Sequence, residues 1–295
     1  MPIEKDYYNL VEKPNYLKHI LYGDTDSIFI QIPDNSDNVY DKIRKMNKVL
    51  TDVNNLIVDY TKNELMVRCG YNPDRCETNF KGEMLIDSIL FIDVKKSYAY
   101  KQIAAEADVN ENNELVGGKI FKEPIIVKRS TLGLKGDTIA LTKDIMSDII
   151  NISFDDTLSK SEKLKTVYKN LGDFNRKFKE AISNLNISYI GSPVRWQKKD
   201  YVIYGMKLYN AIVEPVFQYL SPGYSIQCKF NSLSKIKSLG IDIPIEKMNM
   251  FVFPNELDVE KTNAMLKKYE IEIDVETQWS KVFNTVCERL LNNLK

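Results

Sequence analysis

Two aspartates separated by a single residue lie near the start of the chain, in the stretch YGDTDS at residues 22–27. On a β-strand, side chains two positions apart point to the same side, so the carboxylates of Asp24 and Asp26 can project together. Carboxylates this close either raise a pKa or hold a cation between them. Magnesium takes carboxylate oxygens and keeps positions open for water and phosphate, and two such ions can promote phosphoryl transfer.

Closely spaced aspartates also occur in calcium-binding loops and in solvated turns. An EF-hand calcium loop is excluded because its third ligand, its glycine and its final glutamate are missing at their required offsets. A solvated turn remains compatible with the two aspartates, because Gly and Asp are common turn residues. The spacing alone therefore leaves a metal site and an ordinary turn open.

The elements around these aspartates are predicted from the pattern of apolar residues. Residues 19–32 alternate and predict two short strands. Residues 39–66 carry apolar side chains at intervals of three and four, which predicts a long amphipathic helix that faces the core. Residues 78–100 are rich in β-formers and predict one or two strands, and residues 108–120 predict a polar turn. This part of the chain is expected to form a β-helix-β-β layer.

The rest of the chain has mainly helical patterns. Helices are predicted over 141–152, 161–185 and 277–294 and near 200–219, and strands over 224–231 and 248–259.

The charge balance changes near residue 127, where the pattern becomes mainly helical. Residues 1–127 contain 16 Lys and Arg against 21 Asp and Glu, whereas residues 128–295 contain 25 against 20. We therefore expect an α+β chain with a first domain over 1–127 and a mainly helical second domain, with a few short strands, over 128–295. A basic domain favours an anionic partner, although solvated helix faces give the same counts.

The start of the chain, its apolar runs and its cysteines indicate the cellular compartment. The start of the chain has no apolar stretch of signal-peptide type, and no run approaches the roughly 20 apolar residues of a membrane span. We expect a cytoplasmic protein that does not contact a membrane. The cysteines at 69, 76, 228 and 287 lack the close pairing of structural zinc sites and are expected to be free thiols.

Two motifs resemble those of family B DNA polymerases. YGDTDS, in the context HILYGDTDSIFI, resembles the third conserved palm motif of that family. About 70 residues further on, KKSYAY at 95–100 resembles its Lys-Lys-x-Tyr motif, in the expected order. EPIIVKRSTLG at 123–133 lies where the family passes from palm to thumb, and the remaining helices and short strands are similar to the thumb of T-even-type phage polymerases. The resemblance implies the end of a palm, an antiparallel sheet with a long helix, over 1–127 and a thumb over 128–295.

The resemblance assigns roles to the residues of the first motif. Asp26 would coordinate a metal ion, and Asp24 would be its partner with a less direct role in the coordination shell. The cofactor would be a pair of Mg²⁺ ions. The residues expected to shape the hairpin are Tyr22, Gly23, Thr25 and Ser27.

The second motif and its surroundings would hold primer–template DNA. Lys96 and Tyr98 would grip the primer terminus, with Lys96 in the minor groove, where the acceptors are similar for all base pairs. Lys95 would add attraction for phosphate. Further contacts with the duplex backbone are expected from Lys128, Arg129 and Ser130, and as weaker candidates from Lys198 and Lys199.

Several parts that a complete family B polymerase needs do not occur in this sequence. It has neither D-x-x-S-L-Y-P nor the fingers motif K-x-x-x-N-S-x-Y-G. The D-x-E signature of the proofreading exonuclease, which precedes the palm in this family, occurs only at 258–260 and 274–276, at the other end of the chain. Asp274 is expected to cap the last helix instead. We therefore expect a C-terminal fragment or subunit that acts on dNTPs and DNA together with a second polypeptide carrying the missing aspartate motif, the fingers and the exonuclease.

Two other classes of protein remain open. One is a DNA-binding clamp or scaffold that derives from a polymerase and has lost catalysis. Retention of both Asp24 and Asp26 argues against it, since paired anions do not help a protein bind DNA. The other is a structural protein in which YGDTDS matches by accident, which the second motif at the family's spacing disfavours.

Overall fold

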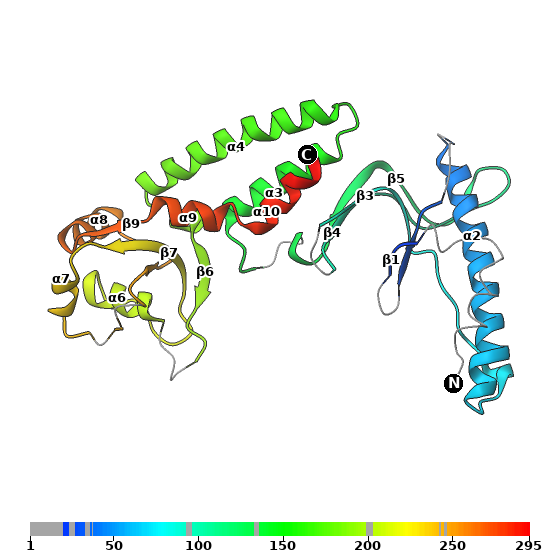
Figure 1. Ribbon diagram of the computed structural model, residues 1–295, viewed down its shortest axis with the longest axis horizontal. Coiled ribbons are helices and arrows are strands. Elements are labelled where there is room, and N and C mark those ends of the chain that lie inside the picture. Colours follow the sequence, from blue (N-terminus) through cyan, green and yellow to red (C-terminus); the bar gives the residue numbers. More distant parts are fainter. Residues whose placement is uncertain are drawn as a thin grey trace. The chain divides into compact units, whose positions relative to one another are not determined.

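The structure is a computed structural model of the 295-residue chain (Figure 1). It describes residues 20–23, 27–32, 36, 38–92, 96–132, 136–198, 203–241, 243–244 and 247–295. The described part combines helices with antiparallel sheets, which confirms the expected α+β class. None of its helices combines the length and the apolar character needed to cross a bilayer.

The chain divides into two compact units, which are described separately. Unit 1 contains Met1–Asp87 and Lys101–Ile125, and unit 2 contains Ser88–Tyr100 and Ile126–Lys295. This division falls two residues before the boundary expected after residue 127. It also places residues 88–100, which the sequence assigned to the first domain, in the second unit.

The first described element of unit 1 is the predicted hairpin, formed by β1 (Ile20–Gly23) and β2 (Ile28–Ile30), which pair antiparallel. The predicted long helix follows as α2 (Val39–Tyr60) and continues as a π-helical segment, Thr61–Met66. Its buried side chains are Ile43 and Met46. The hairpin and the helix are therefore confirmed.

A three-stranded sheet follows α2 in the chain. Its strands, in the order β3-β4-β5, are Met84–Phe91, Tyr98–Val109 and Leu115–Lys128. The polar turn expected over 108–120 is shorter than predicted, because β4 extends to Val109 and β5 begins at Leu115.

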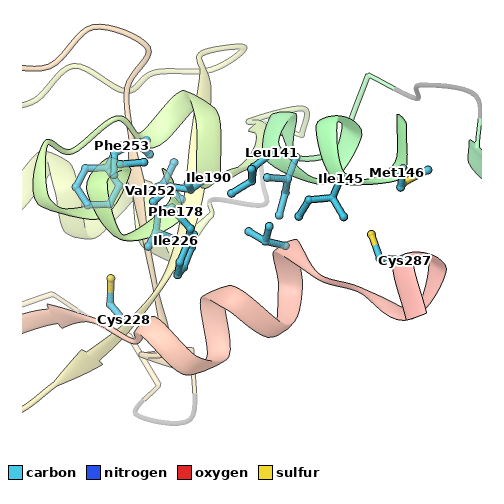
Figure 2. Close-up of a cluster of buried hydrophobic side chains, with 14 of the residues drawn as sticks. Leu141, Ile145, Met146, Phe178, Ile190, Ile226, Cys228, Val252, Phe253 and Cys287 are labelled. Atoms are coloured by element: carbon cyan, nitrogen blue, oxygen red, sulfur yellow. The ribbon is translucent and has the colours of Figure 1, made fainter. Parts of the chain in front are cut away.

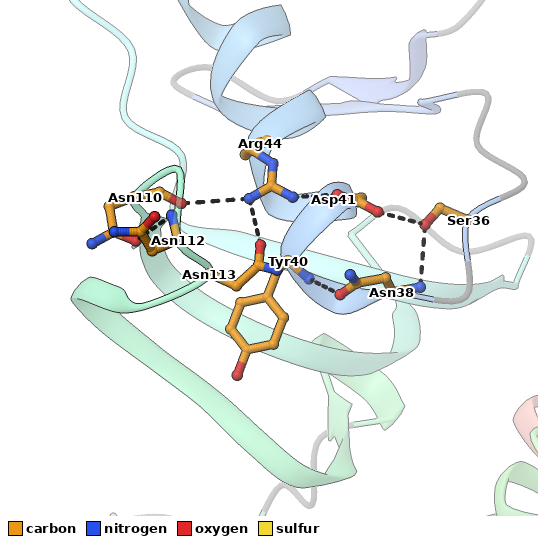
Figure 3. Close-up of polar contacts among 8 residues, drawn as sticks. All are labelled: Ser36, Asn38, Tyr40, Asp41, Arg44, Asn110, Asn112 and Asn113. Atoms are coloured by element: carbon orange, nitrogen blue, oxygen red, sulfur yellow. Dashed lines mark hydrogen bonds and ion pairs between the residues drawn. The ribbon is translucent and has the colours of Figure 1, made fainter.

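The second turn of α2 is bonded to the turn between β4 and β5, as Figure 3 shows. Nη1 of Arg44 donates to the side-chain oxygen of Asn113 at 2.6 Å and to the carbonyl of Asn110 at 3.4 Å. Nη2 of Arg44 pairs with Asp41 on the same helix. Asn38 caps α2 by accepting a hydrogen bond from the amide of Tyr40. The guanidinium thus fixes the helix start against a turn about 70 residues away in sequence.

Unit 2 contains the predicted helices α3 (Ala140–Ser153) and α4 (Lys160–Ser183). Helix α4 begins at a capping box in which Ser159 and Glu162 exchange hydrogen bonds, and these bonds lower the pKa of Glu162. Shorter helices follow: α5 (Ile187–Ile190), α6 (Tyr204–Ile212), α7 (Leu233–Lys237), α8 (Val259–Lys268), α9 (Val275–Val282) and α10 (Thr285–Leu294).

Two helix predictions are wrong in extent. The helix expected near 200–219 is limited to α6, because the chain then meets Pro215, which disfavours helix at the preceding residue. The single helix expected over 277–294 is two helices. Asn284 starts α10 by accepting from the amide of Cys287, and Thr142 donates to the carbonyl of Val282 at 2.7 Å, at the end of α9. Asp274 caps a helix, as predicted, but this helix is α9 and not the last one.

Unit 2 also contains a four-stranded antiparallel sheet. The strands are β6 (Ser192–Arg195), β7 (Pro222–Phe230), β8 (Met250–Phe253) and β9 (Ile271–Ile273). Strand β7 is central and pairs with the other three. The two predicted strands are confirmed as β7 and β8, whereas β6 and β9 were not predicted.

The helices and this sheet share one apolar core, part of which is drawn in Figure 2. Leu141, Ile145 and Met146 of α3 face Cys287 of α10, and all are buried. Burial raises the pKa of Cys287 to about 12, so this thiol stays protonated at neutral pH and acts as a packing group. Among the described residues, the core of unit 1 is small by comparison and consists of Ile43, Ala104, Ala107 and Val109 with partly buried neighbours.

A buried amide joins the sheet of unit 2 to its helices. The side chain of Gln278 is fully buried; its oxygen accepts from the amide of Gln227 on β7 at 2.9 Å, and its nitrogen donates to the carbonyl of Ile190 at 2.6 Å. We expect Gln278→Leu to lower the free energy of unfolding by about 3 kcal/mol, because two buried backbone groups lose their partners. Urea unfolding checks this value.

Ser280→Ala, on the exposed side of the same helix, is the matched control and is expected to change the free energy of unfolding by less than about 0.5 kcal/mol. Equal stability of Gln278→Leu and the wild-type protein would show that the buried amide is dispensable.

Candidate nucleic-acid interface

The first motif lies on the β1–β2 hairpin of unit 1. Gly23 pairs with Ile28 and Tyr22 with Phe29, and the rings of Tyr22 and Phe29 pack with centroids 5.9 Å apart. A β-carbon added at Gly23 would meet the side chain of Ile28 at 3.7 Å, an ordinary contact, so its neighbours do not require glycine there. Ser27 is exposed.

Asp24, Thr25 and Asp26 fall in sequence between the paired residues Gly23 and Ile28 and lie outside the described residues. Among the residues that the structure does describe, no group of three His, Cys, Asp or Glu side chains is arranged to hold a metal ion. The metal-binding role of Asp24 and Asp26 therefore stays a prediction, as does the hairpin-shaping role of Thr25.

The second motif lies in the turn between β3 and β4, in unit 2. The amide of Ile92 donates to the carbonyl of Ser97 at 3.2 Å and closes the turn. Lys96 is exposed and has a φ of 61°, in the left-handed region that a lysine rarely adopts. Ser97 and Ala99 are buried and anchor the start of β4. Lys95 lies outside the described residues.

Tyr98 is held between two other aromatic rings. Its ring is tilted against that of Phe91, with centroids 5.9 Å apart, and is stacked on that of Tyr100, with centroids 6.0 Å apart. The two tyrosines share a face because they are two residues apart on one strand. The aromatic row gives Tyr98 a fixed orientation beside the turn that carries Lys96.

The pairing of β4 with β5 brings Arg129 next to this motif. The amide of Arg129 donates to the carbonyl of Tyr98 at 2.9 Å, and its Nη2 donates to the hydroxyl of Tyr100 at 3.4 Å. Arg129 is exposed. The structure therefore brings together three of the predicted DNA-binding residues, Lys96, Tyr98 and Arg129, in unit 2.

The neighbours of Arg129 have different surroundings. Nζ of Lys128 donates to the hydroxyl of Ser147 on α3 at 2.8 Å, and partial burial lowers the pKa of its ammonium group. Lys128 therefore attaches β5 to α3, and a contact with DNA would have to compete with this hydrogen bond. Ser130 is exposed at the start of a 3₁₀ turn, with a φ of 54°.

The weaker candidates are placed only in part. Lys198 is exposed, and its carbonyl accepts from the indole nitrogen of Trp196 at 2.8 Å. Lys199 lies outside the described residues. Phe91 and Tyr100 were not predicted as supports of Tyr98. The spacing in SYAY already indicated that Tyr98 and Tyr100 share a face, whereas nothing in the sequence indicated the contact with Phe91.

No protein-family model and no curated protein matches this chain. The functional interpretation consequently depends on the residues of the two motifs and on their surroundings.

Proposed function

We propose that this chain is the C-terminal part of a family B DNA polymerase, comprising the end of the palm and the thumb. The observation that carries the proposal is the presence of YGDTDS and KKSY in one chain, each at a hairpin. Residues 22–27 include the end of β1 and stop directly before β2, and residues 95–98 include the start of β4. In this proposal unit 1 provides most of the palm and unit 2 the primer grip and the thumb.

Asp24 and Asp26 suit magnesium because carboxylate oxygens are the ligands this ion prefers. Two carboxylates are an incomplete set for a two-ion site, which agrees with the absence of D-x-x-S-L-Y-P from the sequence. When bound, the ions would supply charge stabilisation for phosphoryl transfer. Asp26 would coordinate them directly, and Asp24 would raise the negative potential at the hairpin.

The reaction of the assembled enzyme would be DNA synthesis from dNTPs. The 3′ oxygen of the primer would bond to the α-phosphorus of the dNTP, the hydroxyl would lose its proton, and the bond to pyrophosphate would break in line. The residues of this chain would contribute positioning. Lys96 and Tyr98 would hold the primer terminus, and Arg129 and Ser130 would bind backbone phosphates.

Properties of unit 1 support a requirement for a second polypeptide. In the described residues its core is small, and the β1–β2 hairpin pairs with no further strand. A two-stranded hairpin is marginally stable by itself, and open strand edges need cover. Many large apolar side chains of unit 1 are also exposed. They are Ile20, Leu21, Ile28, Leu56, Tyr60, Leu65, Val67, Tyr71, Leu115, Val116 and Ile125.

The proposed partner would carry the other metal-binding aspartate, the fingers and the exonuclease. Its surface would cover the apolar side chains of unit 1 and complete the magnesium site. A DNA-binding clamp without catalysis is the alternative, because the cluster of Lys96, Tyr98 and Arg129 can bind a duplex without the aspartates. Incorporation of dNTPs by the complex distinguishes the two.

The primer-gripping role of Lys96 can be tested with the full chain and a fluorescent primer–template duplex. We expect Lys96→Ala to weaken binding by about five-fold at low salt and to lower the slope of log affinity against log salt by about one. The reason is that one cationic contact with DNA is lost. Titrations at several salt concentrations measure both quantities.

Lys237→Ala is the control, since Lys237 is an exposed lysine of unit 2 on α7. It should leave the affinity and the salt slope nearly unchanged. The primer-grip assignment is wrong if both variants have the same effect.

A further inference from the structure

The turn that carries Lys96 is bonded to the last helix of the chain. Nδ2 of Asn293 on α10 donates to the carbonyl of Phe91 at 2.8 Å, across 202 positions of sequence. Phe91 ends β3, and the next residue, Ile92, closes the motif turn through its bond to Ser97. Asn293 therefore binds the residue directly before the one that closes the turn.

Helix α10, which carries Asn293, is anchored in the core of unit 2. Leu290, Leu291 and Leu294 are buried in the core of unit 2, together with Ile92 and Ala99 from either side of the turn. Helix α10 also packs against α3, beside which Figure 1 shows it. The position of Asn293 is thus set by the same core that fixes the ends of β3 and β4.

Phe91 connects Asn293 to the residues proposed to grip the primer. The ring of Phe91 packs on that of Tyr98, and Lys96 lies two residues before Tyr98 in a left-handed conformation. A non-glycine residue keeps a left-handed backbone conformation only where its surroundings stabilise it, because this conformation is unfavourable by itself. The bond from Asn293 is one of the interactions that hold the residues before the turn.

We propose that Asn293 is a positioning residue for DNA binding: through the carbonyl of Phe91 it keeps the turn with Lys96 and Tyr98 in the shape that grips a primer. This inference rests on the proposed function, because the grip itself is part of that proposal. It adds that the end of the chain, about 200 residues away in sequence, controls the motif.

Asn293→Asp tests this role because it keeps the size of the side chain and removes the amide donor. Asn292→Asp is the matched control: Asn292 is an exposed neighbour on the same helix, and the substitution makes the same change of charge. For the full chain with a primer–template duplex, we expect Asn293→Asp to weaken binding about five-fold relative to Asn292→Asp. Hydrogen exchange of the Ile92 amide should also become faster only in Asn293→Asp.

A double-mutant cycle with Lys96→Ala separates a positioning role from a general structural one. If Asn293 acts through Lys96, Asn293→Asp should weaken binding much less in the Lys96→Ala background than in the wild type. Losses that simply add, or an unchanged affinity and exchange rate in Asn293→Asp, would overturn the positioning role.

The same measurements distinguish the two proposals. If Lys96→Ala leaves duplex binding unchanged, the primer-grip function fails, and the role of Asn293 in DNA binding fails with it. If Lys96→Ala weakens binding and Asn293→Asp does not, only the positioning role is rejected.

Discussion

Replacing Asp26 by asparagine is expected to abolish primer extension by the proposed complex of this chain with a second polypeptide, while leaving the affinity of that complex for duplex DNA largely unchanged. The amide keeps the size of the side chain but removes the charge that would hold magnesium. Metal charge stabilisation is worth several kcal/mol, and each 1.36 kcal/mol is a factor of ten in rate, so the loss should be at least about 1,000-fold. Rates of dNTP incorporation by the complex measure it.

Asp59→Asn is the control for this experiment, because Asp59 is an exposed aspartate on α2 of the same unit. It should extend primers like the wild type. An Asp26→Asn complex that synthesises DNA at a near wild-type rate would remove Asp26 from the chemistry. A complex that never incorporates dNTPs would instead favour the clamp alternative.

Gly118→Ala is expected to give the largest loss of stability in unit 1. Gly118 has a φ of 69°, and a β-carbon there would lie 2.1 Å from the carbonyl oxygen of Glu106 on the neighbouring strand. Glu106 itself has a φ of 46°, so both residues of this close contact have a left-handed backbone conformation. Because the obstacle is backbone, the pairing of β4 with β5 has to open. We expect a loss of about 3–5 kcal/mol.

Gly117→Ala is a matched control one residue earlier in β5. Its added β-carbon would meet the side chain of Asp108 at 3.7 Å, an ordinary contact, and it should change stability by less than about 1 kcal/mol. Hydrogen exchange of the Glu106 amide, which donates to the carbonyl of Glu83 at 2.9 Å, reports on this region of unit 1. Equal exchange rates in the two variants would contradict the steric argument.

The long elements could be predicted because their apolar pattern extends over many turns. Helices α2, α3 and α4 each repeat it often enough to be distinguished from a strand. Strands β6 and β9 have four and three residues, too few to show an alternation. The break between α9 and α10 was missed, although Asn284 followed by Thr285 is a usable helix-start signal.

The candidate site could be predicted only in its local parts. The motif residues and the shared face of Tyr98 and Tyr100 follow from the sequence. The approach of Arg129 to Tyr98 depends on how β4 and β5 pair, and the bond from Asn293 to Phe91 depends on the packing of α10. The left-handed conformation of Lys96 was also not predictable, because glycine and asparagine are the usual residues there.

Whether the proposed polymerase site is completed by another polypeptide can be measured by primer extension with Mg²⁺ and a full set of dNTPs. The assay compares the purified chain with the complex isolated from its native source. We predict that the complex extends the primer, contains a polypeptide with D-x-x-S-L-Y-P and needs both components, whereas the chain alone incorporates no nucleotide. Robust synthesis by the chain alone would contradict completion of the site by a second polypeptide.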